Sequence, residues 1–349
     1  MNIKGCSILI PLLIGMLFSC TSKQYDGITY IDWDDFPEPM FLEDDSVEFD
    51  DILMKPTRIA IVDSFMLMKN SNVERFFHVY NLKTKQKVGE RIPFGIGPDE
   101  MLDPIWVLMP DSCLGVFDRN KKKMHIYSKN QFLNSDKTSP ICQLVFDELL
   151  INPIFISGIG VVSSTLESED NKFVIVGLDG EKIAYFGEFP EYYKDMTVFE
   201  KNIALMGDMA VKPDFSRWVM SHKATDMIEI YDNNLNLLKR IQGPDNILPE
   251  LREMSEGIRR SSDSRECYFF PVVTDDYVYV LYDGRVYDVE SPTRYLRNKL
   301  LVFDWEGNPV KYYQLSKPIF HFAIDEERQM LYGLTDSPDF HVVSYSLKD

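Results

Sequence analysis

A strand–turn–strand unit recurs along the chain, and this repetition constrains the fold more than any other feature of the sequence. In each copy an alternating apolar and polar run ends on Tyr, Val or Phe and turns through Asn, Asp or Gly, and in the complete copies a second run follows. Such runs, bounded by turn residues, predict antiparallel hairpins. Six segments share the plan: 76–92, 124–134, 173–189, 228–243, 300–315 and 341–349.

A second alternating pair precedes most of these segments. The preceding pairs are 58–70, 106–118, 158–164, 209–222, 272–283 and 322–336. Two hairpins make a sheet of four strands, which cannot bury both of its faces alone and must stack on its neighbours. The chain over 52–349 is therefore predicted to be all-β, a six-bladed β-propeller of four-stranded antiparallel blades.

The spacing of the repeat supports this prediction. The residues that end the first strand of each repeated segment are 47, 49, 55, 72 and 42 residues apart, near the period of about 40 to 50 expected for four-stranded blades. They are Tyr80, Tyr127, Val176, Tyr231, Phe303 and Tyr345. A β-sandwich would not produce a near-regular repeat. Because the last blade stops after its third strand, we expect a strand from 46–54 to complete it and close the ring.

The segment 243–271 interrupts the repeat between the fourth and fifth blades. Leu251, Met254 and Ile258 have helical spacing after Pro249, which predicts a short helical insertion near 247–260. The insertion is either a rim element with a solvated face or a lid over one channel mouth, where its basic side chains would receive a carboxylate or sulfate group. These basic residues are Arg252, Arg259, Arg260 and Arg265.

The N-terminal residues 1–19 predict a signal peptide. The apolar run from Ile8 to Phe18 is shorter than the roughly 20 residues that cross a bilayer, and it suits a cleaved signal. The sequence Leu17-Phe18-Ser19-Cys20 resembles the bacterial lipobox, which implies lipidation of Cys20 with acyl chains such as palmitate and durable membrane attachment. A plain signal peptide cut near Ser19 is the alternative.

The residues that follow Cys20 bear on the destination and on the lead-in to the propeller. No acidic residue follows the cysteine directly, and by resemblance this implies the outer membrane of a bacterial cell envelope, on either its periplasmic or its outer face. The remainder of 20–51 is acidic and aromatic, and Pro37 and Pro39 argue against regular structure. We expect a tether there.

Charge and cysteine content exclude several classes of partner and site. A net charge of −18 argues against binding to nucleic acid or to anionic lipid surfaces. Outside the signal peptide and the lipobox, the cysteines are Cys113, Cys142 and Cys267, which have no zinc-site spacing and allow one disulfide at most. His78 and His125 occupy the same place in two successive repeats, so they are a repeat signature and not a metal site. No catalytic motif, metal site or cofactor site is predicted.

The loop Gly95-Ile96-Gly97-Pro98-Asp99-Glu100 resembles a phosphate-binding loop only superficially. Asp99 and Glu100 place two carboxylates where the anion would lie, and no lysine or third glycine follows. A crossover between blades, with glycines in conformations that other residues avoid, fits better. Asp99 and Glu100 are candidates for lining the central funnel and contacting a ligand.

These features together resemble the TolB-like six-bladed propeller lipoproteins of Bacteroides-type bacteria, whose G-x-G-P-x-E loop matches residues 95–100. The resemblance implies a fold and a location, and no reaction or ligand. We expect a non-catalytic binding or scaffold module for a protein, peptide or glycan partner. The alternative is a propeller hydrolase or lyase that acts on an envelope or dietary glycan or peptide. Titratable residues from three or more blades, meeting at one channel mouth, would favour the enzyme.

Overall fold

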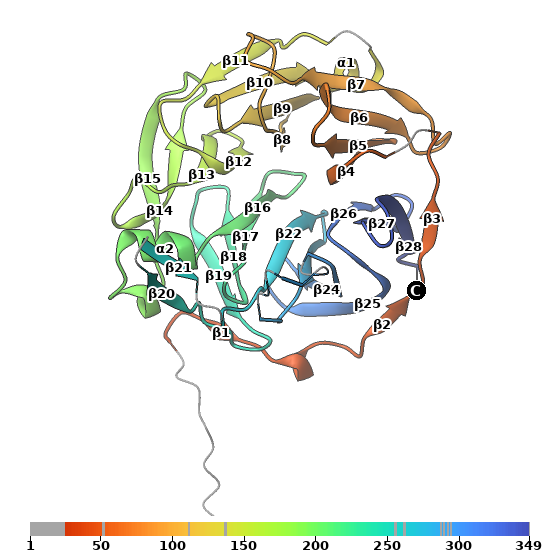
Figure 1. Ribbon diagram of the computed structural model, residues 1–349. Coiled ribbons are helices and arrows are strands. Elements are labelled where there is room, and N and C mark those ends of the chain that lie inside the picture. The colour runs from red at the N-terminus through yellow and green to blue at the C-terminus, as the bar shows by residue number, and fades with distance from the viewer. Residues whose placement is uncertain are drawn as a thin grey trace, which may run out of the picture.

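The chain forms a ring of six β-sheets around a central axis, as predicted (Figure 1). The computed structural model describes residues 25–348 except 51–52, 111, 136–137, 255–256, 261–262, 287, 289, 292 and 294, and gives the backbone alone for 252–254 and 257–260. The predicted signal peptide and Cys20 lie outside the described residues.

The blades follow one another in chain order, and each begins at the axis. The innermost strands of blades 1 to 6 are β4 (Pro56–Val62), β8 (Pro104–Leu108), β12 (Ile151–Ile156), β16 (Gly207–Val211), β22 (Tyr268–Val273) and β26 (His321–Asp325). The second strands are β5 (Phe65–Asn70), β9 (Cys113–Asp118), β13 (Gly160–Ser164), β17 (Arg217–His222), β23 (Tyr277–Tyr282) and β27 (Met330–Thr335).

The third and fourth strands lie progressively further from the axis. The third strands are β6 (Arg75–Asn81), β10 (Lys123–Ser128), β14 (Asn171–Val176), β18 (Met227–Asp232), β24 (Arg297–Asp304) and β28 (His341–Ser346). The fourth strands are β7 (Lys87–Pro93), β11 (Cys142–Val145), β15 (Lys182–Glu188), β19 (Leu237–Gln242), β25 (Pro309–Ile319) and β3 (Asp45–Val47). Helices are few and short: α1 (Lys129–Asn134), α2 (Val198–Ala204) and the 3-10 turns η1 (Trp33–Asp35) and η2 (Glu191–Tyr193).

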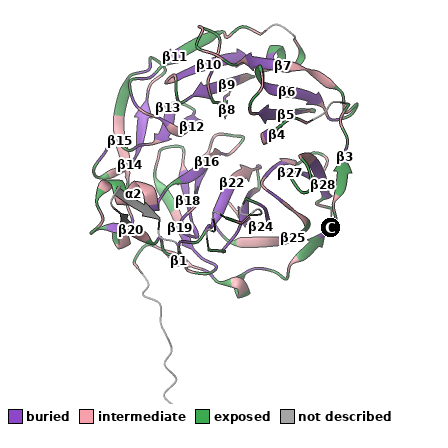
Figure 2. Ribbon diagram, viewed as in Figure 1, coloured by how far each residue is buried: buried purple, intermediate pink, exposed green. Residues whose placement is uncertain are grey.

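Six apolar clusters hold the ring together, one at each interface between neighbouring blades. Figure 2 shows buried residues concentrated in the inner and middle strands and exposed residues at the outer edge. The third-strand residues that defined the repeat fall one in each cluster: Tyr80, Tyr127, Val176, Tyr231, Phe303 and Tyr345. The sequence repeat therefore reflects the demand of each interface for apolar side chains at equivalent positions.

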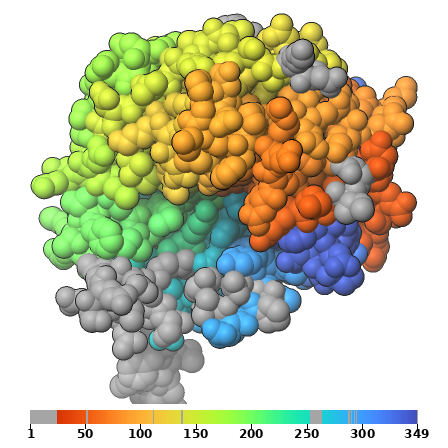
Figure 3. Space-filling model, turned by 45° about the horizontal axis from the view of Figure 1, so that its top comes forward, coloured from red at the N-terminus to blue at the C-terminus, as the bar shows by residue number. Residues whose placement is uncertain are grey.

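The N-terminal segment closes the ring. β3 pairs antiparallel with β28, with Val47 opposite Val342, and so supplies the fourth strand of blade 6. The sequence predicted this strand within 46–54, and β3 begins one residue earlier, at Asp45. Figure 3 shows the red N-terminal residues against the blue C-terminal blade. Val47 is buried in the cluster between blades 6 and 1.

We expected an irregular tether over 20–51, but this expectation is wrong for residues 25–50, which the structure describes. β1 (Thr29–Tyr30) adds a parallel strand to β19, and β2 (Met40–Leu42) adds one to β25. Pro37 and Pro39 lie between these short strands, so the prolines interrupt the segment without preventing edge pairing. Ile31 and Phe36 are buried in the cluster between blades 4 and 5.

The helix predicted near 247–260 is also wrong. The segment forms a hairpin of β20 (Leu251–Met254) and β21 (Gly257–Arg260), in which Arg252 pairs with Arg259 and Leu251 with Arg260. Three apolar residues at helical spacing cover too little chain to offset helix nucleation. Leu251 packs instead against a small cluster beside α2 that contains Tyr193 and Leu205.

A buried charged network connects blades 3 and 4. Glu229, on β18, is fully buried and accepts hydrogen bonds from Lys172 Nζ at 2.7 and 2.5 Å, from Arg240 Nε at 2.7 Å and from the Tyr231 hydroxyl at 3.1 Å. His222 Nε2 lies 3.2 Å from the same carboxylate. Burial disfavours the charged form of Glu229, but Lys172 and the other donors outweigh it and hold its pKa well below the usual value.

Two further sequence expectations concern cysteines and membrane spans. Cys113, Cys142 and Cys267 form no disulfide with one another. Among the described residues, none of the helices has the length and apolar character that a bilayer crossing requires.

Candidate functional site

An axial channel runs along the centre of the ring, and one inner strand from each blade contributes to its wall. The channel encloses about 450 Å³, and the strands that line it surround the centre of Figure 1. Much of the wall is apolar and includes Ile105, Val107 and Ile154. A cavity that combines apolar wall with placed polar groups is the usual form of a site that binds a small ligand or one group of a larger partner.

Polar and aromatic side chains gather at the end of the channel where the inner strands begin. Inner strands of a propeller run in the same direction along the axis, so their first residues reach the same mouth. The contributing residues come from blades 1, 3, 4, 5 and 6. We call this end the polar mouth, and its residues are Arg58, Asn152, Asp208, Lys223, Phe270 and His321.

Local irregularities of the backbone shape the polar mouth. The strand register shifts at the beginning of β4, of β12 and of β22. Within two of these shifts, Asn152 has φ of 53° and Phe270 has φ of 49°, a region that residues other than glycine seldom adopt. Such bulges redirect side chains and backbone amides, and here both residues form hydrogen bonds with Asp208.

Asp208 organises one side of the polar mouth and is itself buried. Its carboxylate lies 3.0 Å from Lys223 Nζ and accepts hydrogen bonds from Asn152 Nδ2 at 3.1 Å and from the Phe270 amide at 3.4 Å. Burial raises the pKa of Asp208, whereas Lys223 and Arg58 lower it, and the net shift is downward. Asp208 is therefore ionised at neutral pH and already paired with a lysine.

Arg58, Phe270 and His321 form the other side of the polar mouth. The Arg58 guanidinium carbon lies 5.4 Å from the centroid of the Phe270 ring, and that ring lies 4.5 Å from the His321 ring. His321 Nδ1 accepts a hydrogen bond of 3.4 Å from the Ile59 amide, which assigns the proton of a neutral ring to Nε2. Burial, aided by Arg58, lowers the pKa of His321 to about 3, so the ring is neutral at physiological pH.

The charges of the polar mouth do not cancel. Arg58 and Lys223 are positive, Asp208 is negative and His321 is neutral, which leaves one net positive charge. The Arg58 side chain forms no hydrogen bond or ion pair with any described residue. The nearby Lys69 is paired with Asp103. The channel entrance is therefore locally positive on a chain whose net charge is −18.

The predicted candidates Asp99 and Glu100 lie outside the channel wall, in the connection from blade 1 to blade 2. Glu100 Oε2 accepts a hydrogen bond of 2.8 Å from the Gly97 amide, so this carboxylate holds its own loop. Gly95 has φ of 152°, a backbone conformation that residues with a side chain rarely adopt, which explains the glycine. Asp99 is exposed and lies 3.4 Å from Gln143 Nε2. The crossover interpretation is confirmed, and ligand contact by either residue stays a prediction.

The predicted arginines divide into two groups. Arg252, Arg259 and Arg260 belong to the β20–β21 hairpin, which Figure 1 places at the periphery beside α2 and away from the axis. Arg265 follows the hairpin, is exposed, and donates a hydrogen bond of 2.7 Å to the Gly284 carbonyl. This peripheral position matches the alternative in which the insertion is a rim element. Ligand binding by the four arginines stays a prediction.

The sequence analysis identified none of the residues of the polar mouth. Five of them lie within the first three residues of an inner strand, and Lys223 directly follows β17. They share no motif and no short spacing. For Arg58, Asp208 and His321 the available signal was a polar residue at the start of a predicted inner strand or directly before it.

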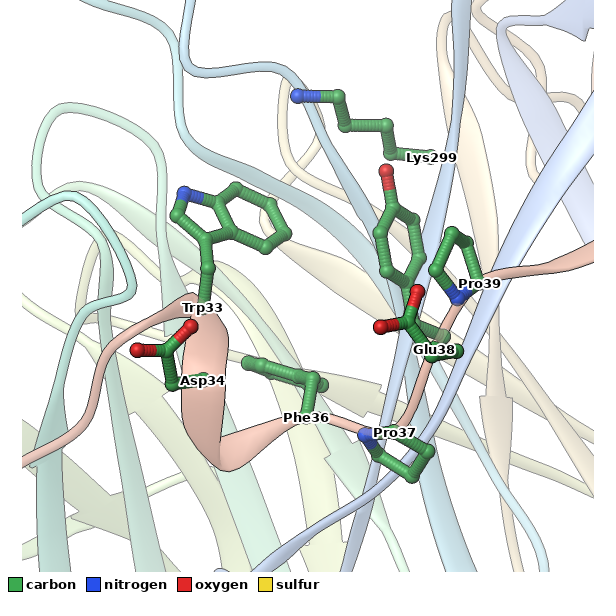
Figure 4. Close-up of a pocket in the computed structure, with 8 residues that line it drawn as sticks. Trp33, Asp34, Phe36, Pro37, Glu38, Pro39 and Lys299 are labelled. Atoms are coloured by element: carbon green, nitrogen blue, oxygen red, sulfur yellow. The ribbon is translucent and has the colours of Figure 1, made fainter.

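A second hollow lies where the N-terminal segment packs on blade 5 (Figure 4). Trp33 and Tyr312 have ring centroids 5.5 Å apart, and Lys299 Nζ lies 4.8 Å from the Trp33 ring. The Trp33 indole donates a hydrogen bond of 2.7 Å to Asp245. These contacts fasten the lead-in to the outer side of the propeller, so packing accounts for them. Within the described residues, no three His, Cys, Asp or Glu side chains gather as metal ligands would.

The fold and site define the protein as a six-bladed β-propeller with a polar entrance to an apolar channel. The chain belongs to the TolB-like 6-blade propeller-like family, whose profile matches residues 35–327. No curated protein matches the chain significantly.

Solved structures from Bacteroides share this fold. A putative exported protein from Bacteroides fragilis is 12% identical, with a TM-score of 0.57 over 91% of this chain and 98% of that one. A member of the duf4221 family from Bacteroides vulgatus is 11% identical, with a TM-score of 0.54 over 87% and 95%. At such identities the likeness shows the fold alone.

Proposed function

We propose that this protein is a non-catalytic binding module of the bacterial cell envelope that receives a group of its ligand or partner at the polar mouth. The observation that carries the proposal is the meeting of polar and aromatic side chains from five blades at the entrance to an apolar channel of about 450 Å³. The partner is a protein, a peptide or a glycan.

The competing hypothesis was a hydrolase or lyase with titratable residues from several blades at one mouth. Such residues do converge here, from blades 1, 4 and 6. Their chemistry nevertheless suits binding better, because a general acid or base works best with a pKa near the operating pH. The pKa of His321 is about 3, and Asp208 is ionised and occupied by Lys223. Ser112 and Cys113 line the channel at its opposite end, where Ser112 lies in the turn after β8 and Cys113 begins β9.

Binding at the channel is tested by filling it. Ala60 lines the channel on β4, and Ala60→Phe would occupy its space without altering the charge of the polar mouth. We expect a ligand found by thermal shift among envelope glycans and peptides to stabilise the wild type and to lose this effect in Ala60→Phe. Ile183→Phe, on the exposed outer strand β15, is the control and should behave like the wild type. Stabilisation that persists in Ala60→Phe would place binding elsewhere.

The proposal includes attachment to the outer membrane through lipid on Cys20. It is supported by the lipobox-like sequence, and the structure from Bacteroides fragilis that shares the fold is described as that of a putative exported protein. We expect Cys20→Ala to move the protein from the membrane fraction to the soluble fraction, and a metabolic acyl label to disappear from it. Cys142→Ala removes an exposed cysteine of the propeller and should leave both readouts unchanged. Unchanged membrane partition of Cys20→Ala would refute the anchor.

A further inference from the structure

The Arg58 side chain is a cation without a direct ion pair in a partly enclosed position. Arg58 is half-buried in the channel wall. A guanidinium is always charged and carries five N–H donors, and charged groups removed from water are normally paired. The guanidinium of Arg58 has no hydrogen bond or ion pair with a described residue. Its N–H donors therefore face the channel without a protein acceptor among the described residues and can receive an anion.

The acidic groups around Arg58 are committed to other cations. Asp208 pairs with Lys223 at 3.0 Å, and Asp103 pairs with Lys69, which is the neighbour of Arg58 across the β4–β5 ladder. Neither carboxylate lies within ion-pair distance of the guanidinium. Within the described residues Arg58 therefore has no anion in direct contact, although Asp208 attracts it from a greater distance.

The Arg58 guanidinium has an aromatic neighbour in the polar mouth. It lies over the Phe270 ring at 5.4 Å, and the Phe270 backbone is held by its hydrogen bond to Asp208. A guanidinium with a cation–π contact can still offer its N–H edge to a carboxylate, which that edge matches with two parallel hydrogen bonds. A lysine in the same place would lack this fork.

The wall beyond the polar mouth indicates what the anion is attached to. Ile59, Ile105 and Ile154 line the channel below the charged rim, and the enclosed volume is about 450 Å³. An apolar chain or ring gains free energy by entering such a wall, while its charged end stays at the entrance.

We propose that the polar mouth binds a carboxylate joined to an apolar group, with Arg58 as its bidentate partner. The proposal rests on the proposed function, since it names the group that the channel receives. Two sources share this chemistry: a free amphipathic acid, and the C-terminal carboxylate of a peptide that ends in apolar residues.

The experiment measures binding to the wild-type protein by calorimetry. The free-acid probes are octanoate, its neutral isostere octanamide and acetate; the peptide probe is N-acetyl-Ala-Leu-Phe, as free acid and as amide. We expect octanoate or the peptide acid to bind, and the amides and acetate to bind at least about tenfold more weakly, because only the acids offer both charge and apolar area. The probe that binds identifies the source. Equal binding of acid and amide, or no binding of either acid, would overturn the proposal.

Substitutions of Arg58 test the assigned partner. Arg58→Met keeps the side-chain length and loses the charge, and we expect it to weaken binding of the acid about tenfold or more. Arg58→Lys should retain part of the affinity because it keeps charge without the fork. Arg217→Met, at the start of β17, is the control and should bind like the wild type.

The two proposals fail in different ways. Acid binding that Ala60→Phe abolishes and Arg58→Met leaves intact would retain the channel as the site and refute the assignment of Arg58. If Arg58→Met does not fold, as judged by its thermal melt, the comparison of acid with amide on the wild type still decides whether a carboxylate is required.

Discussion

Glu229→Gln is expected to destabilise the protein by about 3–5 kcal/mol, because it leaves Lys172 and Arg240 without the anion that compensates them. Lys172 Nζ is 2.5 Å from the nearer Glu229 oxygen, and both side chains are almost completely buried. Breaking such a pair costs far more than its formation contributes, since the remaining cation is still removed from water. Urea unfolding followed by tryptophan fluorescence measures the change.

The control for this prediction is Glu306→Gln. Glu306 pairs with Arg217 at 3.0 Å, but its side chain is 64% exposed, so solvent screens the pair. We expect a change within about 0.5 kcal/mol for that variant. Comparable losses of unfolding free energy in the two variants would show that the buried Glu229 network contributes no more to stability than an exposed ion pair.

Val47→Asp is expected to open the ring, with a loss of about 3 kcal/mol or more from an uncompensated charge in the interface between blades 6 and 1. Val47 lies in the cluster that contains Tyr80 and Val342, and β3 is the fourth strand of blade 6. The neighbouring Ser46 is exposed, so Ser46→Asp should leave stability nearly unchanged. Thermal unfolding and limited proteolysis of the lead-in compare the two variants. Equal melting temperatures would mean that β3 is dispensable for closure.

Ring closure gives the N-terminal segment a structural role that its composition conceals. Acidic residues and prolines are typical of solvated linkers, yet three short strands of this segment pair with blades 4, 5 and 6. Edge pairing needs only two or three residues of extended backbone, and the outer edges of finished blades supply the partners. Because those partners lie about 200 to 300 residues further along the chain, local sequence could not reveal the pairing.

The insertion after blade 4 shows a similar limit for short elements. The spacing of Leu251, Met254 and Ile258 is compatible with a helix and with a hairpin. The contact of Leu251 with the cluster beside α2 favours the hairpin, and that contact exists only in the folded ring.

The repeat by itself determined the six-bladed architecture. Each interface between blades needs apolar residues at equivalent strand positions, and this pattern is visible in each local stretch of sequence. Tyr80, Tyr127 and Tyr231 mark three of those interfaces, as their spacing predicted. Only the tertiary structure decided the site. Arg58, Asp208 and His321 lie on three different blades, share no motif, and meet because inner strands of one direction bring their first residues to the same mouth. Their pairing, burial and orientation depend on strand bulges and on contacts between blades, which the sequence spacing does not encode.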